Sequence, residues 1–309
     1  MRVSIFGVGA VGGLIAATLS HYTDAEIHLH VRGIWGSNLL IHGLQVESES
    51  TISVPPEAFD ISFDEHDFPP TLEHSSDVAL ICSKAPDLER LLPIVVSTLK
   101  PNGIVCILSN GLGLVEIARR HLPPDSMIYT TTTHGAYRTE DRIIWAGKGA
   151  IQIGTSNSAA HHEAVEQFIA LLEQAQLNPE TKEDGRAMIW EKALMNVSIN
   201  PIAALTGKRN GELLSTEIFQ HCMNIFKEAA TIARYEGIEV ADELNFEKRL
   251  TQVLQSTSEN QCSMLQDIQF GRKTEIDFLN GKIVDLAEKH GIPAPLNAIL
   301  TSMVRSCHP

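Results

Sequence analysis

At 309 residues the chain is long enough to bury two hydrophobic cores, and 43% hydrophobic with 20% charged residues is an ordinary globular composition. The net charge of -14 argues against nonspecific binding to nucleic acid or to an anionic membrane surface. The five cysteines are widely spaced without a C-x-x-C pair, which favours a reduced, cytoplasmic protein over a disulfide scaffold or a zinc site. We therefore expect no metal ion, no signal peptide and no membrane span.

The first predicted strand, residues 3–6, runs into a glycine turn and then into an apolar helix over 14–19. The turn, Gly7-Val8-Gly9-Ala10-Val11-Gly12, has the spacing G-x-G-x-x-G that binds the pyrophosphate of a dinucleotide at a helix N-terminus. Gly7 permits the tight turn, Gly9 lets a phosphate approach the backbone, and Gly12 lets the helix pack on the strand. A buried turn without a ligand is the alternative.

The second predicted strand, residues 25–31, ends in Arg32 and carries no carboxylate at its end. An Asp or Glu at this point binds the ribose 2′-hydroxyl of NAD, whereas an arginine accommodates the 2′-phosphate of NADP. We therefore predict NADPH/NADP as the cofactor. A surface arginine that contacts no ligand is the alternative.

Strands and helices alternate along the next part of the chain. Residues 43–54 predict a small β excursion, 59–76 a loop-rich connection and 142–153 a hairpin. The remaining elements are strands at 77–82, 104–108 and 127–133, with helices at 87–99 and 114–120. Near-continuous apolar strands indicate a sheet covered on both faces, as in a Rossmann-type doubly wound α/β fold.

The pattern changes near Asn178-Pro179. Residues 183–305 show helical periodicity and almost no strand signal, with breaks at 207–211, at Gly237 and at 291–295. We therefore predict an NADP-binding domain over 1–180 and an all-helical substrate domain over 181–309.

Ligands of doubly wound sheets bind beyond the carboxyl ends of the strands. Lys84 and Asn110 each follow a predicted strand, so we expect both to face the nicotinamide end of the cofactor. A solvated lysine and a turn asparagine are the alternatives.

Three polar residues of the helical part, Lys192, Asn196 and Asn200, are spaced by four and share one helix face. Apolar residues lie beside them, which suggests the lining of a cleft, with a partly exposed helix side as the alternative. Ser263 and Glu275 are twelve residues apart, about 18 Å on an unbroken helix. Either a break intervenes, with Gly271 as the candidate, or the two touch different parts of the ligand set.

Together these segments resemble the ketopantoate reductase family, the 2-dehydropantoate 2-reductases of pantothenate synthesis. The resemblance is carried by the glycine turn, Asn110-Gly111, and residues 131–134, 190–201, 210–213, 263–267 and 274–281. It implies an N-terminal Rossmann domain, a C-terminal helical domain and an active site in the cleft between them.

The resemblance also implies roles for single residues. Lys192 matches the catalytic lysine that protonates the oxygen formed on hydride transfer, and Glu275 matches an acidic active-site residue. Burial should lower the lysine pKa from its usual ~10.4, and Glu275 should oppose that shift. The implied substrate contacts are Asn110, Lys192, Asn196, Asn200, Asn210 and Ser263. The implied cofactor contacts are Gly7, Val8, Gly9, Ala10, Val11, Gly12, Arg32, Lys84, Asn110, Ala136 and Glu275.

The implied function is NADPH-dependent reduction of 2-dehydropantoate to (R)-pantoate in pantothenate and coenzyme A biosynthesis. Gly135 and Tyr137 beside Ala136 depart from the family pattern, so reduction of another 2-keto acid is one alternative. A nonenzymatic NADPH-binding sensor is the other. As partner we expect a small 2-keto acid, with neither nucleic acid nor membrane, and a homodimer stays open.

Overall fold

The computed structural model describes residues 1–64, 66–154 and 163–307, which divide into two compact units. The first, called the α/β unit below, comprises Met1–Ser109 and Leu114–Gly185. The second, called the helical unit, comprises Asn110–Gly113 and Arg186–Pro309. Among the described residues no helix is long and apolar enough to span a bilayer.

The main sheet of the α/β unit contains eight strands within the described residues. They are β1 (Arg2–Phe6), β2 (Glu26–Val31), β5 (Phe59–Phe63), β6 (Ser76–Ile81), β7 (Leu99–Ile107), β8 (Met127–Thr132), β11 (Ile151–Gly154) and β12 (Pro179–Lys182). Their order is β12-β11-β8-β7-β6-β1-β2-β5, and neighbours from β5 to β8 are parallel. The chain winds outward from β1 in both directions, which confirms the Rossmann-type prediction.

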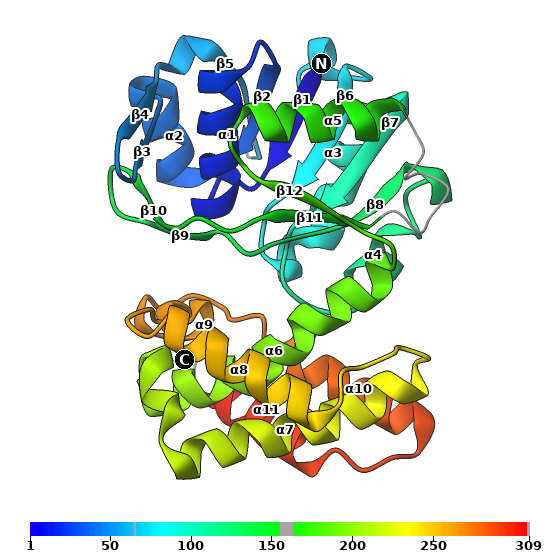
Figure 1. The fold of residues 1–309 in the computed structure, drawn as a ribbon. Helices are drawn as coiled ribbons and strands as arrows, with labels where there is room; N and C mark the ends of the chain where they lie inside the picture. Colours follow the sequence, from blue (N-terminus) through cyan, green and yellow to red (C-terminus); the bar gives the residue numbers. More distant parts are fainter. Residues whose placement is uncertain (65, 155–162, 308–309) are drawn as a thin grey trace. The chain divides into compact units, whose positions relative to one another are not determined.

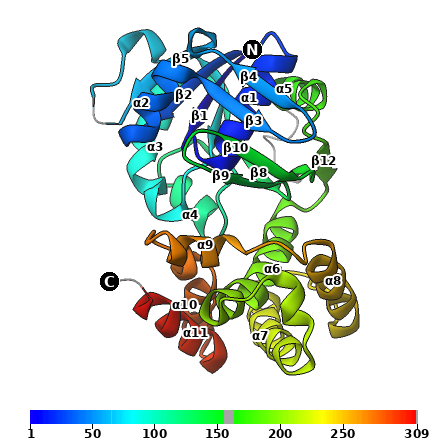
Figure 2. The same cartoon turned by 90° about the vertical axis from the view of Figure 1, so that its left-hand side faces the viewer.

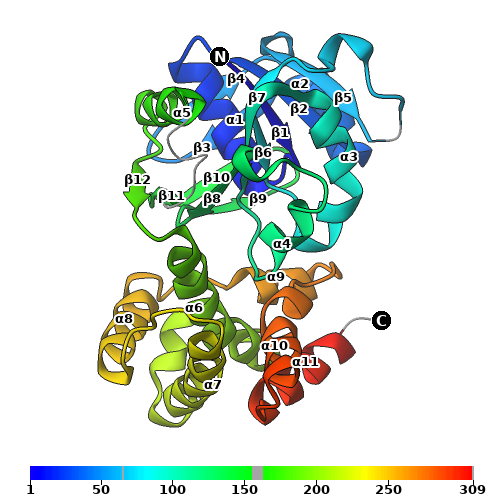
Figure 3. The ribbon, with the colours of Figure 1, turned by 90° about the vertical axis from the view of Figure 1, so that its right-hand side faces the viewer.

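Helices cover both faces of this sheet. They are α1 (Ala10–Tyr22), α2 (Gly33–His42), α3 (Leu88–Thr98), α4 (Leu114–Ala118) and α5 (Glu163–Gln174), with short 3-10 helices η1 (Pro56–Ala58), η2 (Pro70–Leu72), η3 (Ala85–Asp87) and η4 (Pro124–Ser126). Figures 1 and 3 show α1 and α5 on one face and α3 on the other. Residues 12–19 of α1 are buried without a gap, because a second sheet covers the outer side of this helix.

The second sheet has four described strands in the order β4-β3-β10-β9 (Figure 2). They are β3 (Leu44–Glu47), β4 (Thr51–Val54), β9 (Gly135–Arg138) and β10 (Ile143–Gly147). The β excursion predicted for 43–54 is thus confirmed as the β3–β4 hairpin. A Cβ on Gly13 of α1 would lie 2.2 Å from Ile143 Cδ1, so this glycine lets the second sheet pack closely on the helix.

The hairpin predicted over 142–153 is wrong, because β10 and β11 belong to different sheets. β10 pairs with β9 and β3, whereas β11 pairs with β8 and β12. The chain passes from one sheet to the other at Gly149, whose backbone N–H donates to His134 Nδ1 at 3.0 Å. A Cβ at Gly149 would lie 2.4 Å from the Thr133 carbonyl, so this glycine serves a close approach to the end of β8 and does not form a hairpin turn.

The loop predicted over 59–76 is also wrong in its first part. Residues 59–63 form β5, an edge strand parallel to β2. Ser62 on β5 is buried and shares hydrogen bonds of 2.8 Å with His28 Nε2 and His30 Nδ1. The added strand therefore provides polar partners for two buried histidines of β2.

The carboxyl ends of the central strands lie level with one another. Phe6, the last residue of β1, pairs with His30 of β2 and Ile81 of β6. The loops that follow these strands therefore start from one edge of the sheet. They carry the glycine turn, Arg32 and Lys84.

The helical unit confirms the all-helical prediction for the second part of the chain. Its elements are α6 (Gly185–Thr206), η6 (Asn210–Leu214), α7 (Thr216–Tyr235), α8 (Glu243–Ser256), α9 (Ser263–Gln269), η7 (Ile276–Phe278), α10 (Asn280–His290) and α11 (Pro295–Ser306). In Figure 3, α8 lies on one side of α6 and α10 with α11 on the other. Trp190, Leu194 and Val197 of α6 join the core with Phe226 and Leu250.

A proline inside α6 is compensated by a side chain of α10. Pro201 has no N–H to donate to the Val197 carbonyl. Asn280 Nδ2 donates to that carbonyl at 3.1 Å and to Asn297 Oδ1 at 2.9 Å. Because Asn280 is fully buried, this contact fixes the second half of α6, which carries Asn200, against α10.

Candidate active site

The three glycines of the turn have different surroundings. Gly7 has φ +93°, and a Cβ there would lie 2.4 Å from the Ser83 backbone nitrogen. A Cβ on Gly12 would lie 2.4 Å from the Gly7 oxygen. A Cβ on Gly9 would meet no atom of the described residues within 4 Å. Gly7 and Gly12 are therefore required by the fold, whereas the missing side chain of Gly9 leaves open space at the turn.

The helix that follows presents its N-terminus at this space. α1 begins at Ala10, and its N-cap Gly9 offers no side chain to the backbone N–H groups of the first turn. Trp35 of α2 donates from Nε1 to the Val8 oxygen at 2.6 Å and thereby holds the turn. Open space beside uncapped N–H groups fits the pyrophosphate of a dinucleotide.

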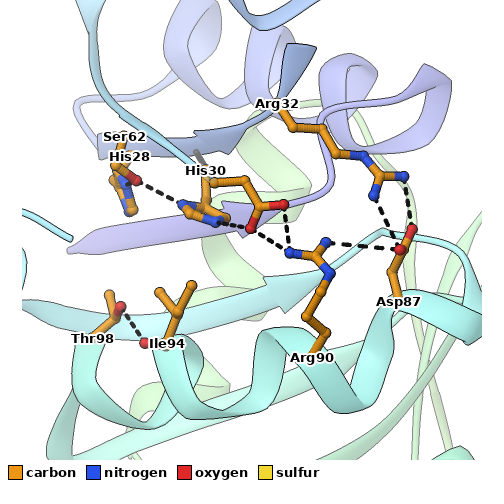
Figure 4. A network of polar contacts seen from close by, with 9 residues as sticks. His28, His30, Arg32, Ser62, Asp87, Arg90, Ile94 and Thr98 are labelled. Atoms are coloured by element: carbon orange, nitrogen blue, oxygen red, sulfur yellow. Dashed lines mark hydrogen bonds and ion pairs between the residues drawn. The ribbon is translucent and has the colours of Figure 1, made fainter. Parts of the chain in front are cut away.

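The other predicted cofactor residues of this unit lie on three different segments. Arg32 is the N-cap residue of α2, and its guanidinium binds both oxygens of Asp87, at 3.0 and 2.8 Å (Figure 4). Lys84 is the N-cap of η3 and is partly buried. Ala136 lies on β9, opposite Trp145 of β10. Arg32 and Lys84 thus follow neighbours of β1, whereas Ala136 belongs to the second sheet.

The polar stripe of α6 is present as predicted. Lys192, Asn196 and Asn200 lie within one continuous helix at intervals of four residues, so they share a face. Lys192 and Asn196 are partly buried, and Asn200 is buried. The Cys262 thiol donates to the Asn200 backbone oxygen at 3.6 Å, which brings Ser263, the next residue, to this end of α6.

Residues 110–113 pack into the helical unit although they follow β7 in sequence. Leu112 N donates to the Phe278 oxygen at 2.7 Å, and Asn110 Nδ2 donates to Glu275 Oε2 at 3.2 Å. Gly111 has φ +125°, and a Cβ there would lie 2.6 Å from Phe278 Cβ. Glycine at 111 is therefore needed for the close approach of this loop to Phe278, three residues after Glu275.

Lys192 and Glu275 interact electrostatically. Burial lowers the pKa of Lys192 to about 8, and the carboxylate of Glu275 acts in the opposite direction. Both effects have the predicted sign. A lysine with this pKa keeps its proton at neutral pH but releases it more readily than an exposed lysine does.

The helical stretch that carries Ser263 and Glu275 is broken. α9 ends at Gln269, Gly271 has φ +62°, and Glu275 precedes the 3-10 helix η7. Of the two alternatives left open by the sequence, the structure shows the first, a break at Gly271. The distance of about 18 Å expected on one straight helix therefore does not apply to Ser263 and Glu275.

Asn210 is buried at the start of η6. Its Nδ2 donates to the Thr257 hydroxyl at 2.9 Å, and its backbone N–H donates to the Asn260 oxygen at 3.0 Å. Among the described residues, its Oδ1 accepts no hydrogen bond.

Sequence reasoning missed two residues that shape the cofactor side of the α/β unit. Trp35 binds the glycine turn and Asp87 binds Arg32. Both contacts join segments far apart in sequence, so spacing did not indicate them. The available signal was the position of Asp87 in the segment after a predicted strand, three residues beyond Lys84.

Two family models match adjacent parts of the chain. Residues 3–158 match the model described as ketopantoate reductase PanE/ApbA. Residues 184–308 match the model described as ketopantoate reductase PanE/ApbA C terminal. This family reduces ketopantoate to pantoate with a pyridine nucleotide.

Individual relatives extend over the whole chain. The 2-dehydropantoate 2-reductase of Vibrio cholerae serotype O1 is 31% identical over 309 residues, which cover 99% of this chain and 97% of that protein. Among solved structures, D-mandelate dehydrogenase with NADH and anilino(oxo)acetate has a TM-score of 0.89 at 23% identity. A PanE/ApbA family ketopantoate reductase from Ralstonia eutropha JMP134 has a TM-score of 0.86 at 24% identity. Each structure covers 99% of this chain and 98% of its own, and at these identities each establishes the fold alone. The two family models and the full-length relative show that the chain belongs to the ketopantoate reductase family and is an oxidoreductase that acts on a small keto acid.

Proposed function

We propose that the protein reduces 2-dehydropantoate to (R)-pantoate with NADPH, as a step of pantothenate and coenzyme A biosynthesis. The observation that carries this proposal is the cluster of Lys192, Glu275 and Asn110 in the helical unit. It combines a proton donor of lowered pKa with a counter-charge and an amide, which is the equipment that carbonyl reduction requires. Full-length relatives named 2-dehydropantoate 2-reductase support the choice of substrate.

In this proposal residues 1–180 bind the cofactor and residues 181–309 bind the substrate and carry the catalytic groups. The glycine turn from Gly7 to Gly12 holds the pyrophosphate, with Arg32, Lys84 and Ala136 as further contacts. Asn196, Asn200, Asn210 and Ser263 bind the substrate. Asn110 and Glu275 serve both ligands.

When bound, NADPH supplies the hydride that the 2-keto carbon accepts. The Lys192 ammonium donates a hydrogen bond to the keto oxygen and gives it a proton as negative charge develops there. This stabilises the transition state more than the ground state, because the keto oxygen carries more negative charge in the transition state than in the ground state. Glu275 orients the ammonium and limits the fall of its pKa. Asn110 keeps the Glu275 carboxylate in place through its hydrogen bond.

A panel of short 2-keto acids tests the substrate. NADPH oxidation should be fastest with ketopantoate, with (R)-pantoate formed in equal amount. A faster rate with another 2-keto acid would select the alternative substrate. NADPH binding without turnover of any keto acid would select a nonenzymatic sensor.

The pH dependence of kcat/KM should have a basic limb set by Lys192. Since the protonated amine is the active form, activity should be present below the lysine pKa and lost as pH rises through about 8. Glu275→Gln removes the charge that raises this pKa, so the limb should move to lower pH. Profiles of the two proteins between about pH 6 and 10 measure the shift.

Glu191→Gln is the matched control, because Glu191 is exposed, pairs with Arg249 and is adjacent to Lys192 in sequence. Its basic limb should coincide with that of the wild type. An unchanged limb in Glu275→Gln would contradict the proposed coupling between the carboxylate and the lysine.

The fold alone does not select the nucleotide, because D-mandelate dehydrogenase, which has a similar fold, is bound to NADH. The proposed preference for NADPH therefore rests on Arg32. Arg32→Ala should weaken NADPH binding roughly 10- to 100-fold and leave NADH binding nearly unchanged, because only NADPH has a 2′-phosphate for charge-assisted bonds. Titration of both nucleotides measures this, with the exposed Arg120→Ala as control. Equal wild-type affinities for the two nucleotides would count against the proposal.

A further inference from the structure

Asp87 lies between two arginines at the carboxyl edge of the main sheet (Figure 4). Its oxygens accept from Arg32 Nη1 at 3.0 Å and Nη2 at 2.8 Å, and Arg90 Nη2 is 3.7 Å from Oδ1. Asp87 is the last residue of η3, in the loop after β6, whereas Arg32 directly follows β2. The pair is partly exposed to solvent: the Arg32 side chain is 59% exposed and the Asp87 side chain 22%.

The position of this pair relates it to the nucleotide. β2 and β6 are the two neighbours of β1, and β1 runs into the glycine turn. The Arg32–Asp87 pair therefore joins the loops on either side of that turn, at the point where the strand order reverses. In doubly wound folds the adenosine ribose binds at the end of the second strand, next to this point.

The second arginine is engaged elsewhere. Arg90 binds the carboxylate of Asp64, which also lies 3.3 Å from the buried His30 Nε2. The pKa of Asp64 is lowered by its bonds to Arg90 and His30, against the effect of burial, so it stays ionised. The arginines and aspartates of this cluster thus balance in charge, and Arg32 is the more exposed of the two arginines.

We propose that Asp87 is a specificity-determining residue, because it competes with the 2′-phosphate of NADPH for Arg32. The inference rests on the proposed use of NADPH. A 2′-phosphate has to draw the Arg32 guanidinium away from Asp87 and to approach a like charge as it does so. A 2′-hydroxyl can instead donate to the Asp87 carboxylate while Arg32 stays paired. Asp87 therefore makes the affinity for NADPH relative to NADH smaller than Arg32 alone would make it.

Dissociation constants of the binary complexes, measured by the fluorescence of the reduced nicotinamide, test this directly. Asp87→Asn keeps the shape of the side chain but removes its charge, so Kd for NADPH should fall about tenfold. Kd for NADH should stay the same or rise, since a good acceptor for the 2′-hydroxyl is lost. The ratio of the two constants should therefore move about tenfold towards NADPH.

Asp60→Asn is the matched control. It also removes a carboxylate paired with an arginine, but Asp60 lies on β5 and pairs with Arg2 at the start of β1, at the opposite edge of the sheet. It should leave the ratio unchanged. Asp87→Ser is a second variant that removes the charge, and thermal unfolding confirms that each variant is folded.

A double variant tests the route through Arg32. In the Arg32→Ala background, Asp87→Asn should change the ratio of the two dissociation constants by clearly less than in the wild type, because the competition for Arg32 is gone and only the direct effect of the Asp87 charge on the 2′-substituent remains. An unchanged ratio in both Asp87 variants, or the full shift without Arg32, would overturn the proposal. The binding measurements contain no keto acid, so they stay valid if the protein does not turn over ketopantoate. The proposal for Asp87 and the proposed function can therefore be rejected independently of each other.

Discussion

Replacing Lys192 with methionine is expected to lower kcat for ketopantoate reduction by about 10²- to 10⁴-fold while NADPH binding persists. Methionine keeps an unbranched apolar stem of similar length at this partly buried position of α6. It has neither a proton to give nor a positive charge to meet the developing oxyanion. Steady-state kinetics gives the loss in kcat, and titration with NADPH alone shows that the cofactor still binds.

Two further variants complete this test: one is a control, and the other separates the proton of Lys192 from its charge. Lys227→Met is the control, because Lys227 is an exposed lysine of the same unit, paired with Glu243 at 2.8 Å, and its loss should leave kcat unchanged. Lys192→Arg keeps the charge but holds its proton too tightly to donate, so KM should recover more than kcat does. Turnover of Lys192→Met within threefold of the wild type would rule out the proposed role.

Adding a side chain at Gly9 is expected to weaken nucleotide binding strongly without unfolding the protein. Within the part of the chain that the structure describes, no atom lies within 4 Å of the position of a Cβ at Gly9. The φ of -84° at Gly9 is open to other residues, so Gly9→Val should fold. The added methyl groups would occupy the space proposed for the pyrophosphate. Losing two charge-assisted bonds to the N-terminus of α1 corresponds to roughly 10²- to 10⁴-fold in Kd.

Gly7→Ala provides the contrast. Its Cβ would collide with the Ser83 backbone, and φ at this position is +93°, so the melting temperature should fall markedly. Titration and thermal unfolding of both variants test the distinction. Tight NADPH binding by a folded Gly9→Val protein would show that the phosphates bind elsewhere.

The periodicity of the chain predicted most of the fold because it reflects burial. The central strands are continuous apolar runs since helices cover both faces of the sheet, and the α6 spacing appears unchanged in the structure. The two errors arose where local patterns compete with tertiary packing. Residues 59–63 alternate like an edge strand but belong to a stretch that also holds Pro69-Pro70, which favours a loop. Gly149 lies where the chain passes from one sheet to the other, and in sequence this segment resembles a turn.

The residues of the candidate site could be selected from spacing and resemblance, but their contacts could not. Nothing in the sequence placed Asn110 against Glu275, because 165 positions separate them. The same holds for Asp87 and Arg32, which come together only because β2 and β6 flank β1. The burial that lowers the pKa of Lys192 likewise depends on how the helical unit packs.

The central claim is that Lys192 delivers a proton to the oxygen of a 2-keto acid reduced by NADPH. A crystal structure with NADP⁺ and pantoate tests it most directly. The account predicts Lys192 Nζ within about 3 Å of the pantoate 2-oxygen, and the reacting carbon about 3–3.5 Å from nicotinamide C4. A Lys192 amine that points into solvent, with another group on that oxygen, would contradict it.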